Sequence, residues 1–130
     1  MDFTRPLLLV SVEAAEPALA LVSALCDRLT QLAVVVSVTE PTQALGEPDL
    51  LAFERALEQG EALVRGLAGR LPEVSLTCEV LVGRPSELLE QALTTHTPDL
   101  VVFPRHEDGL AWETARTHRV AAAMVGTAKL

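Results

Sequence analysis

The fold of this chain is decided by the stretch Val82-Gly83-Arg84-Pro85-Ser86-Glu87-Leu88-Leu89, which leads into Pro98-Asp99-Leu100-Val101-Val102-Phe103-Pro104. The glycine is placed to end a strand. Pro85 suits the first turn of a helix, because its φ is already near the helical value and its missing N–H would have no partner there. The run from Leu100 to Phe103 has no polar alternation, which is typical of a strand buried on both faces of a parallel sheet. The stretch therefore predicts a β-α-β unit.

The same alternation of strands and helices extends in both directions from this unit. Further strands are predicted at Leu7 to Val12, Ala33 to Thr39, Val74 to Val82 and Val120 to Val125. Helices are predicted from Pro17 onward, from a cap at Asp49 to Leu71, and from Leu110 to His118. Leu50 is expected on the inner side of the long helix. The alternating strand that ends at Val82 should turn that residue to the core and lie near a sheet edge.

The last strand has an alternative, because its run of three alanines could also extend a helix. We favour the strand because it completes the β-α repeat. The predicted centre of the sheet consists of Leu9, Val10, Val35, Val101 and Val102.

Length and composition indicate one globular domain over residues 1–130, with 49 % hydrophobic and 22 % charged residues. The net charge of −8 argues against a nucleic-acid surface. The longest early apolar run is too short to span a membrane, and it lacks the basic start of a signal peptide, so we expect a cytoplasmic protein. Cys26 and Cys78 have no CxxC spacing, and we expect two buried free thiols.

Several of these motifs resemble the universal stress protein family. Gly83-x-Pro85 with Leu88-Leu89, followed by Asp99-Leu100-Val101-Val102, is similar to the family's G-x-P helix start and D-L-I-V strand. The stretch from Leu8 to Pro17 is similar to its opening strand. The resemblance implies a three-layer α/β/α sandwich of Rossmann-like type, whose five-stranded parallel sheet has the order 3-2-1-4-5.

With that strand order, the winding reverses between strands 1 and 4, and the crevice at their carboxyl ends is the expected ligand site. The candidate cofactor-binding residues of this crevice are Val12, Glu13, Ala14, Thr39, Gly83, Arg105, His106 and Gly109. The alternative is that Arg105 and His106 are ordinary solvated loop residues.

Two departures from the family pattern concern ATP. Members that bind ATP usually have aspartate and glycine where this chain has Glu13 and Ala14. They also carry a glycine motif after strand 4, whereas the segment here, Arg105 to Trp112, is short and keeps one glycine. A phosphate cradle needs backbone N–H groups turned to the anion with no Cβ in the way. Because Glu107 and Asp108 would also place carboxylates there, we expect a degenerate site without tight ATP binding.

Other kinds of site have weaker support. His106, Glu107, Asp108 and His118 match no tetrahedral metal spacing, so no metal is expected. Nothing beside Glu13 resembles a nucleophile or a second acid, and catalysis is not expected. A receiver-like domain would need a phospho-acceptor aspartate where Gly83 stands.

The expected function is therefore that of a non-enzymatic universal stress protein-like domain acting in the stress response through dimerisation and partner binding, with no cofactor. The alternative is a sensor that binds ATP or AMP in the crevice. The homodimer is expected through the uncharged edge strand Val120 to Val125, since related proteins often dimerise through the last strand.

Overall fold

The computed structural model of the chain describes residues 3–26, 28–38, 50–104 and 110–125. The strands are β1 (Pro6–Val10), β2 (Gln31–Val38), β3 (Ser75–Val82), β4 (Leu100–Pro104) and β5 (Ala121–Val125). The helices are α1 (Ala15–Leu25), α2 (Leu50–Arg70), α3 (Pro85–His96) and α4 (Leu110–Thr117), with a short 3₁₀ turn, η1 (Val12–Ala14), before α1. In these segments no helix is long and apolar enough to cross a bilayer.

All five strands are parallel and follow the order β3-β2-β1-β4-β5, which confirms the predicted arrangement. The central strand β1 pairs through Leu7 with Ala33 of β2 on one side and with Val101 of β4 on the other. The last segment is a strand parallel to β4, so the helical alternative is wrong; it begins at Ala121, one residue later than predicted.

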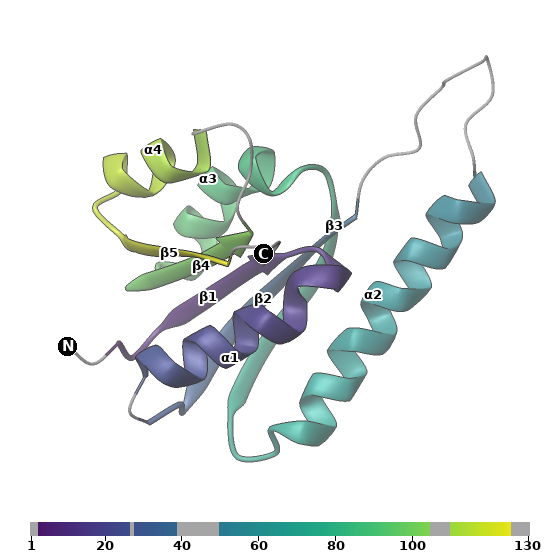
Figure 1. Cartoon of the computed structure of the whole chain (residues 1–130), viewed down its shortest axis with the longest axis horizontal. Coiled ribbons are helices and arrows are strands. Elements are labelled where there is room, and N and C mark those ends of the chain that lie inside the picture. The colour runs from purple at the N-terminus through teal and green to yellow at the C-terminus, as the bar shows by residue number, and fades with distance from the viewer. Residues whose placement is uncertain (1–2, 27, 39–49, 105–109, 126–130) are drawn as a thin grey trace, which may run out of the picture.

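The helices cover both faces of the sheet, α1 and α2 on one side and α3 and α4 on the other (Figure 1). Because successive strand residues point to opposite faces, Leu8 and Val10 of β1 pack toward α1 while Leu7 and Leu9 pack toward α3. Every residue of β1 is buried, which explains its unbroken apolar run. The predicted sheet centre is confirmed, since its five residues have no exposed surface: Leu9, Val10, Val35, Val101 and Val102.

Helix α2 differs from the prediction at its first turn. Leu50 was expected to face the core, but it is 58 % exposed, and Leu51 beside it is 59 % exposed. The physical reason is length: 21 helical residues extend about 31 Å, whereas the eight residues of the parallel strand β3 extend about 26 Å. The helix touches the sheet closely at Gly60, where an added Cβ would lie 3.1 Å from Cγ1 of Val80.

Smaller corrections concern where elements begin and end. Val82 was expected to face the core, but it is 40 % exposed at the end of the edge strand β3. The first helix begins at Ala15, preceded by η1, rather than at Pro17. The expected cap at Asp49 lies outside the described residues. Both cysteines are free thiols as predicted, although Cys78 is only half-buried; burial raises the pKa of its thiol.

Asp99, which precedes β4, ties the start of that strand to the start of β1. Its carboxylate accepts hydrogen bonds from the backbone N–H groups of Thr4 and Arg5, both at 2.8 Å, and from the Thr4 hydroxyl at 3.1 Å. Its own N–H donates to the carbonyl of Arg5 at 3.1 Å. An aspartate just before a buried apolar strand therefore sets how β4 enters the sheet beside β1.

Candidate ligand crevice at the carboxyl ends of the strands

The chain winds in opposite directions on the two sides of β1, because β2 follows on one side and β4 lies on the other. In open parallel sheets, this switch point leaves a crevice outside the carboxyl ends of the two strands. Here β1 ends at Val10 and β4 at Pro104. We call the region beyond these two ends the carboxyl-edge crevice.

The β1 side of the carboxyl-edge crevice is formed by η1. Ser11 is extended, and the N–H of Ala14 donates to its carbonyl at 3.1 Å to close the turn. Val12 and Ala14 are half-buried and pack against the core beneath α1. No side chain caps the N-terminus of α1. The N–H groups of Ala14 and Ala15 donate within η1 and Pro17 has none, so this end of α1 offers the edge chiefly the positive end of the helix dipole.

Gly83 borders the same edge at the end of β3. Its φ of +144° is one that residues with a side chain rarely adopt, and an added Cβ would lie 3.3 Å from Cδ2 of Leu88. Its N–H donates to the carbonyl of Val38 at 2.8 Å, which holds the turn against β2. The carboxylate of Glu87 then accepts a hydrogen bond of 3.4 Å from the N–H of Arg84, at the start of α3.

The structure thus places some of the predicted site residues and not others. Val12, Ala14 and Gly83 lie at the carboxyl edge, although Gly83 is separated from β1 by the whole of β2. The backbone of Glu13 forms the middle of η1, and its side chain lies outside the described residues. Four further candidates fall on segments that the structure does not describe: Thr39, Arg105, His106 and Gly109.

Ser37 is a residue of this edge that the sequence reasoning missed. It is buried, and its hydroxyl lies 3.5 Å from the carbonyl oxygen of Val10, the last residue of β1. The hydrogen bond joins the carboxyl ends of β1 and β2 on the face that α3 covers. The available signal was a single serine inside a run of valines, from Val34 to Val38.

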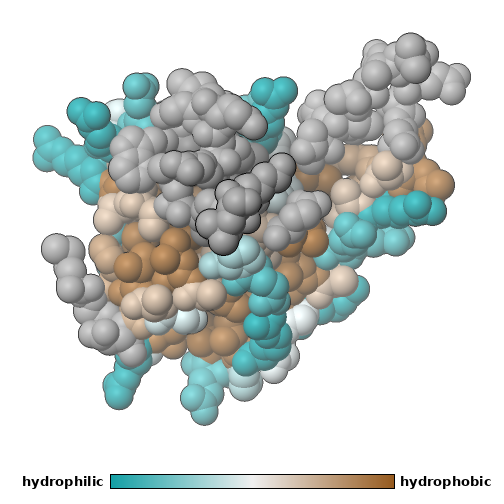
Figure 2. Space-filling model, viewed as in Figure 1, coloured by the Kyte–Doolittle hydropathy of each residue, from teal (hydrophilic) through white to brown (hydrophobic). Residues whose placement is uncertain are grey.

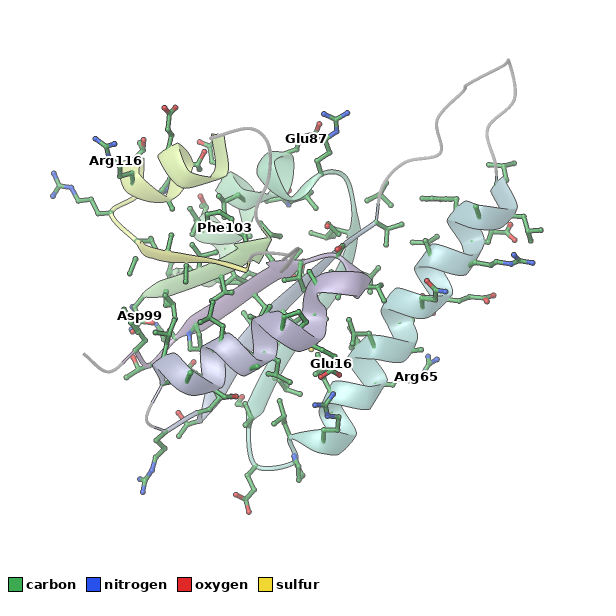
Figure 3. All side chains as sticks on the ribbon, viewed as in Figure 1. Glu16, Arg65, Glu87, Asp99, Phe103 and Arg116 are labelled. Atoms are coloured by element: carbon green, nitrogen blue, oxygen red, sulfur yellow. The ribbon has the colours of Figure 1, made fainter. Side chains whose placement is uncertain are left out.

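The acidic residue nearest the start of α1 is engaged elsewhere. Glu16 forms an ion pair with Arg70 at the end of α2, and its carboxylate lies between the two helices (Figure 3). The hydrogen bond from Arg70 lowers the pKa of Glu16, and the same contact raises the pKa of the guanidinium. Both side chains are more than half exposed, so the pair contributes little to stability.

The described residues at the carboxyl edge are mainly apolar. This edge is formed by the apolar side chains of Val12 and Val82 and by the backbone of Gly83. Across residues 3–26, 28–38, 50–104 and 110–125 there is no group of three or more metal-ligating side chains.

Comparison of the sequence with family models and with curated proteins finds no match. Comparison of the structure does find similar folds. A protein of the universal stress protein family from Burkholderia pseudomallei has a TM-score of 0.65 and 20 % identity, with 92 % of this chain and 94 % of that chain covered. A hypothetical protein whose biochemical function was assigned from its structure has a TM-score of 0.65 and 14 % identity, over 96 % and 97 % of the two chains.

A third similar structure is a universal stress protein family protein from Arabidopsis thaliana with AMP bound. Its TM-score is 0.59 and its identity 11 %, over 94 % of this chain and 91 % of that chain. Together with the strand order and the two helical layers, these similarities show that the chain has the fold of the universal stress proteins.

Proposed function

We propose that this chain is a non-enzymatic, cytoplasmic stress-response domain that acts through self-association and partner binding and does not hold ATP tightly. The observation that carries the proposal is the open edge of β5. This strand pairs with β4 on one side and is the last strand of the sheet on the other. Unpaired N–H and C=O groups along such an edge are a template for pairing with another chain.

The surroundings of β5 support the same proposal. Ala121 is exposed, and Ala122 and Ala123 are half-buried, so the start of the strand has only small side chains. Figure 2 shows apolar surface in the region that β5 and α1 occupy in Figure 1, and Leu21 and Leu25 of α1 are partly buried apolar residues of that helix. Partly exposed apolar side chains beside an unpaired strand edge favour association there.

Weak ATP binding is supported by the residues that follow β1 and β4 in the sequence. Ala14 has a Cβ where ATP-binding members of the resembling family usually have glycine, and it packs against the core. The segment Arg105 to Trp112 carries one glycine and two carboxylates in sequence. A phosphate group needs close, unhindered backbone N–H donors, and negative charge beside it opposes binding.

Thermal unfolding with nucleotides tests the proposal. A ligand present at a hundred times its dissociation constant stabilises a fold by about 2.7 kcal/mol, which is a melting shift of several degrees for a domain of this size. We expect millimolar ATP with magnesium to leave the melting temperature within about one degree of its starting value. A shift of several degrees that saturates with ATP concentration would refute the proposal that this chain does not hold ATP tightly.

A second candidate function is nucleotide sensing in the same crevice, with ATP or AMP as ligand. Two observations favour it: the uncapped N-terminus of α1 at the crevice, and the similar fold of the Arabidopsis protein with AMP bound. In this case Val12, Ala14 and Gly83 would border the nucleotide with the other candidate residues. AMP in the same thermal series separates the two functions, because a saturable shift with AMP supports the sensor and its absence supports the association domain.

A further inference from the structure

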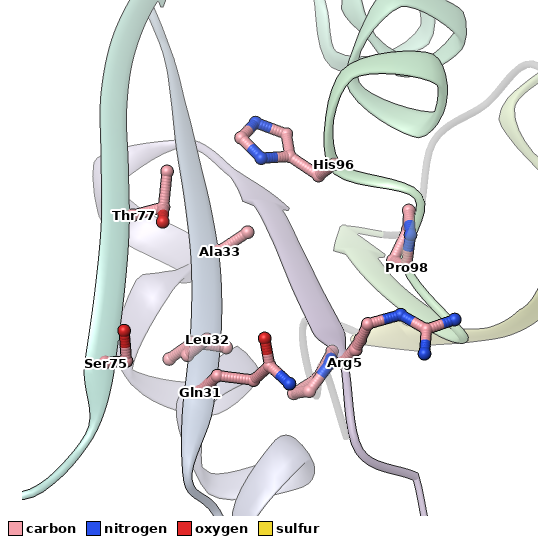
Figure 4. Close-up of a pocket in the computed structure, with 9 residues that line it drawn as sticks. Arg5, Gln31, Leu32, Ala33, Ser75, Thr77, His96 and Pro98 are labelled. Atoms are coloured by element: carbon pink, nitrogen blue, oxygen red, sulfur yellow. The ribbon is translucent and has the colours of Figure 1, made fainter.

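A small pocket lies at the opposite, amino-terminal edge of the sheet, away from the carboxyl-edge crevice. Its floor is β1, β2 and β3, and its wall is the end of α3 with the turn that follows (Figure 4). The volume is about 100 Å³. The lining side chains that the argument uses are Gln31, Ala33, Ser75, Thr77 and His96. We call this the His96 pocket.

The pocket exists because Ala33 is small. It stands among Leu32, Val34, Val35 and Val36 in β2, and the register places it beside Thr77 of β3. Helix α3 covers one face of β1 and of the later part of β2. Its last residue, His96, reaches over the strands toward Thr77, and the short side chain of Ala33 leaves the space beneath the ring unfilled (Figure 4).

The strand residues around this space are polar. The register pairs Gln31 with Ser75 and Ala33 with Thr77, so an amide and two hydroxyls lie on neighbouring strands at the pocket. Within the described part of the chain, none of these three polar side chains has a protein hydrogen-bond partner. The guanidinium of Arg5 turns toward Pro98, and its Nε donates to the carbonyl of Thr97 at 3.0 Å.

His96 has a ring nitrogen without a protein partner among the described residues. Its side chain is only 10 % exposed, and Nε2 lies 3.5 Å from Oε1 of Glu79. In the neutral tautomer that carries its proton on Nε2, the nitrogen that faces this carboxylate, Nδ1 is a hydrogen-bond acceptor. Nδ1 has no partner among the described residues. A buried acceptor left without a hydrogen bond is unfavourable, and a ligand in the pocket would supply one.

We propose that the His96 pocket binds a small neutral molecule with several hydroxyl groups, a polyol of three or four carbons. A hydroxyl can donate to Nδ1 of His96 and also accept from the hydroxyls of Ser75 and Thr77 or the amide of Gln31. An anion is disfavoured, because Glu79 lies against the ring and the chain carries a net charge of −8.

The size of the pocket agrees with this class of ligand. An apolar cavity of about 150 Å³ accepts benzene, with its six heavy atoms, and the His96 pocket, of about 100 Å³, suits a molecule of about the size of glycerol. So few heavy atoms give weak binding, with a dissociation constant on the order of millimolar. The proposal is independent of the function proposed for the carboxyl edge.

The test is a glycerol titration followed by NMR, observing the ring nitrogens of His96 and the side-chain amide of Gln31. We expect shifts that saturate in the millimolar range. The diether 1,2-dimethoxyethane is the control ligand, because it has no hydroxyl to donate to Nδ1 and should give no saturating shift.

Variants connect the signal to the pocket. Ala33→Leu fills the space without removing a polar group and should abolish saturation, and Thr77→Val should weaken binding severalfold. Thr95→Val, the same change at an exposed position of α3, should leave the titration unchanged. Three results would overturn the proposal, because each would show a pocket that holds water only. The first is a shift that rises linearly with glycerol concentration, and the second is equal saturation by the diether. The third is an unaltered titration in folded Ala33→Leu and Thr77→Val proteins.

Discussion

At the residue scale, the position of Gly83 requires a glycine for two reasons. Its φ of +144° disfavours any side chain, and a Cβ there would press on Leu88 at 3.3 Å. We expect Gly83→Ala to lower the free energy of unfolding by about 1–2 kcal/mol. Gly66→Ala is the matched control, for which we expect a change of opposite sign in the free energy of unfolding. That glycine is inside α2, and no atom lies within 4 Å of an added Cβ. The substitution should raise stability by about 1 kcal/mol.

Urea unfolding of the two glycine variants checks both signs together. A Gly83→Ala protein as stable as the unmodified chain would show that the turn between β3 and α3 relaxes without strain. A loss of stability in Gly66→Ala would contradict the exposure of that face of α2.

Asp99 gives the fold a dependence on pH. Burial tends to raise the pKa of its carboxyl, but hydrogen bonds from the backbone of Thr4 and Arg5 and from the Thr4 hydroxyl outweigh this, with help from the charge of Arg5, and lower it. A carboxyl whose pKa is lower in the folded state contributes stability that is present above its unfolded pKa of about 3.9 and is lost as the pH falls through the folded value.

We therefore expect Asp99→Asn to lower the free energy of unfolding by about 1 kcal/mol at pH 7, with the difference shrinking below about pH 4. Denaturant unfolding at several pH values measures this. Glu58→Gln, on an exposed part of α2, is the control and should show little difference at any pH. A constant difference between Asp99→Asn and the unmodified chain from pH 7 to pH 2 would be inconsistent with a lowered pKa.

Residue patterns predicted some of these roles and not others. Gly83 and Asp99 stand in motifs that mark a strand end and a strand start, so their positions followed from local sequence. Ser37 and His96 did not, because neither stands in a motif and their burial depends on which element of the tertiary structure covers them. Sequence spacing alone does not tell which face of β2 or which end of α3 will be enclosed.

At the element scale, β4 tests the buried-strand prediction. Val101 has no exposed surface and packs against the α3 side of the sheet. Val101→Asp would bury a charge without a partner, at a loss of several kcal/mol, which is comparable with the whole stability of a small domain. We expect this variant to be unfolded or insoluble by circular dichroism and chromatography.

The same substitution at the end of β3 is the control for β4. Val82 is 40 % exposed, so Val82→Asp keeps its charge in contact with water and should cost below about 1 kcal/mol. A soluble Val101→Asp protein that unfolds cooperatively near the midpoint of Val82→Asp would contradict the position of β4 in the sheet centre.

The periodicity of apolar residues predicted which helices and strands form better than it predicted the burial of the residues at their ends. The apolar stripe of α2 was read over its whole length, yet the helix is longer than the strand it covers, and Leu50 lies beyond the sheet. The end of β3 shows a similar limit, because alternation assigns Val82 to a face of the sheet but does not tell how much of that side chain is covered there. The strand Ala121–Val125 was ambiguous locally and is decided by its pairing with β4.

At the scale of the whole molecule, strand order followed from the sequence more readily than the site did. A regular β-α repeat with two apolar strands next to β1 leaves few arrangements of the sheet, and the resemblance selected the one observed. The crevice depends instead on the segments after β1, β2 and β4, whose sequences have no periodic pattern from which a conformation could be predicted. Of these segments the structure describes η1, and it places Val12 and Ala14 against the core.

The open edge of β5 leads to the prediction that two copies pair there, and the charge of the chain gives it a measurable signature. Each copy carries a net charge of −8, so mutual repulsion opposes association at low salt and is screened as salt is added. We expect sedimentation equilibrium at micromolar concentration to show a homodimer whose dissociation constant falls between 20 mM and 300 mM salt. Ala121→Lys places a charge at an exposed position of β5 and should weaken the dimer at least tenfold.

Ala62→Lys separates the effect of the edge from that of the overall charge. It adds the same positive charge at an exposed position of α2, on the far side of the sheet from β5, so it reduces the repulsion between copies equally but leaves the β5 edge unchanged. We expect this variant to dimerise as well as the unmodified chain, while both lysine variants keep its melting temperature at dilution. A monomer at every salt concentration would refute the pairing. Equal dimerisation of the two variants would place the interface on a surface other than β5.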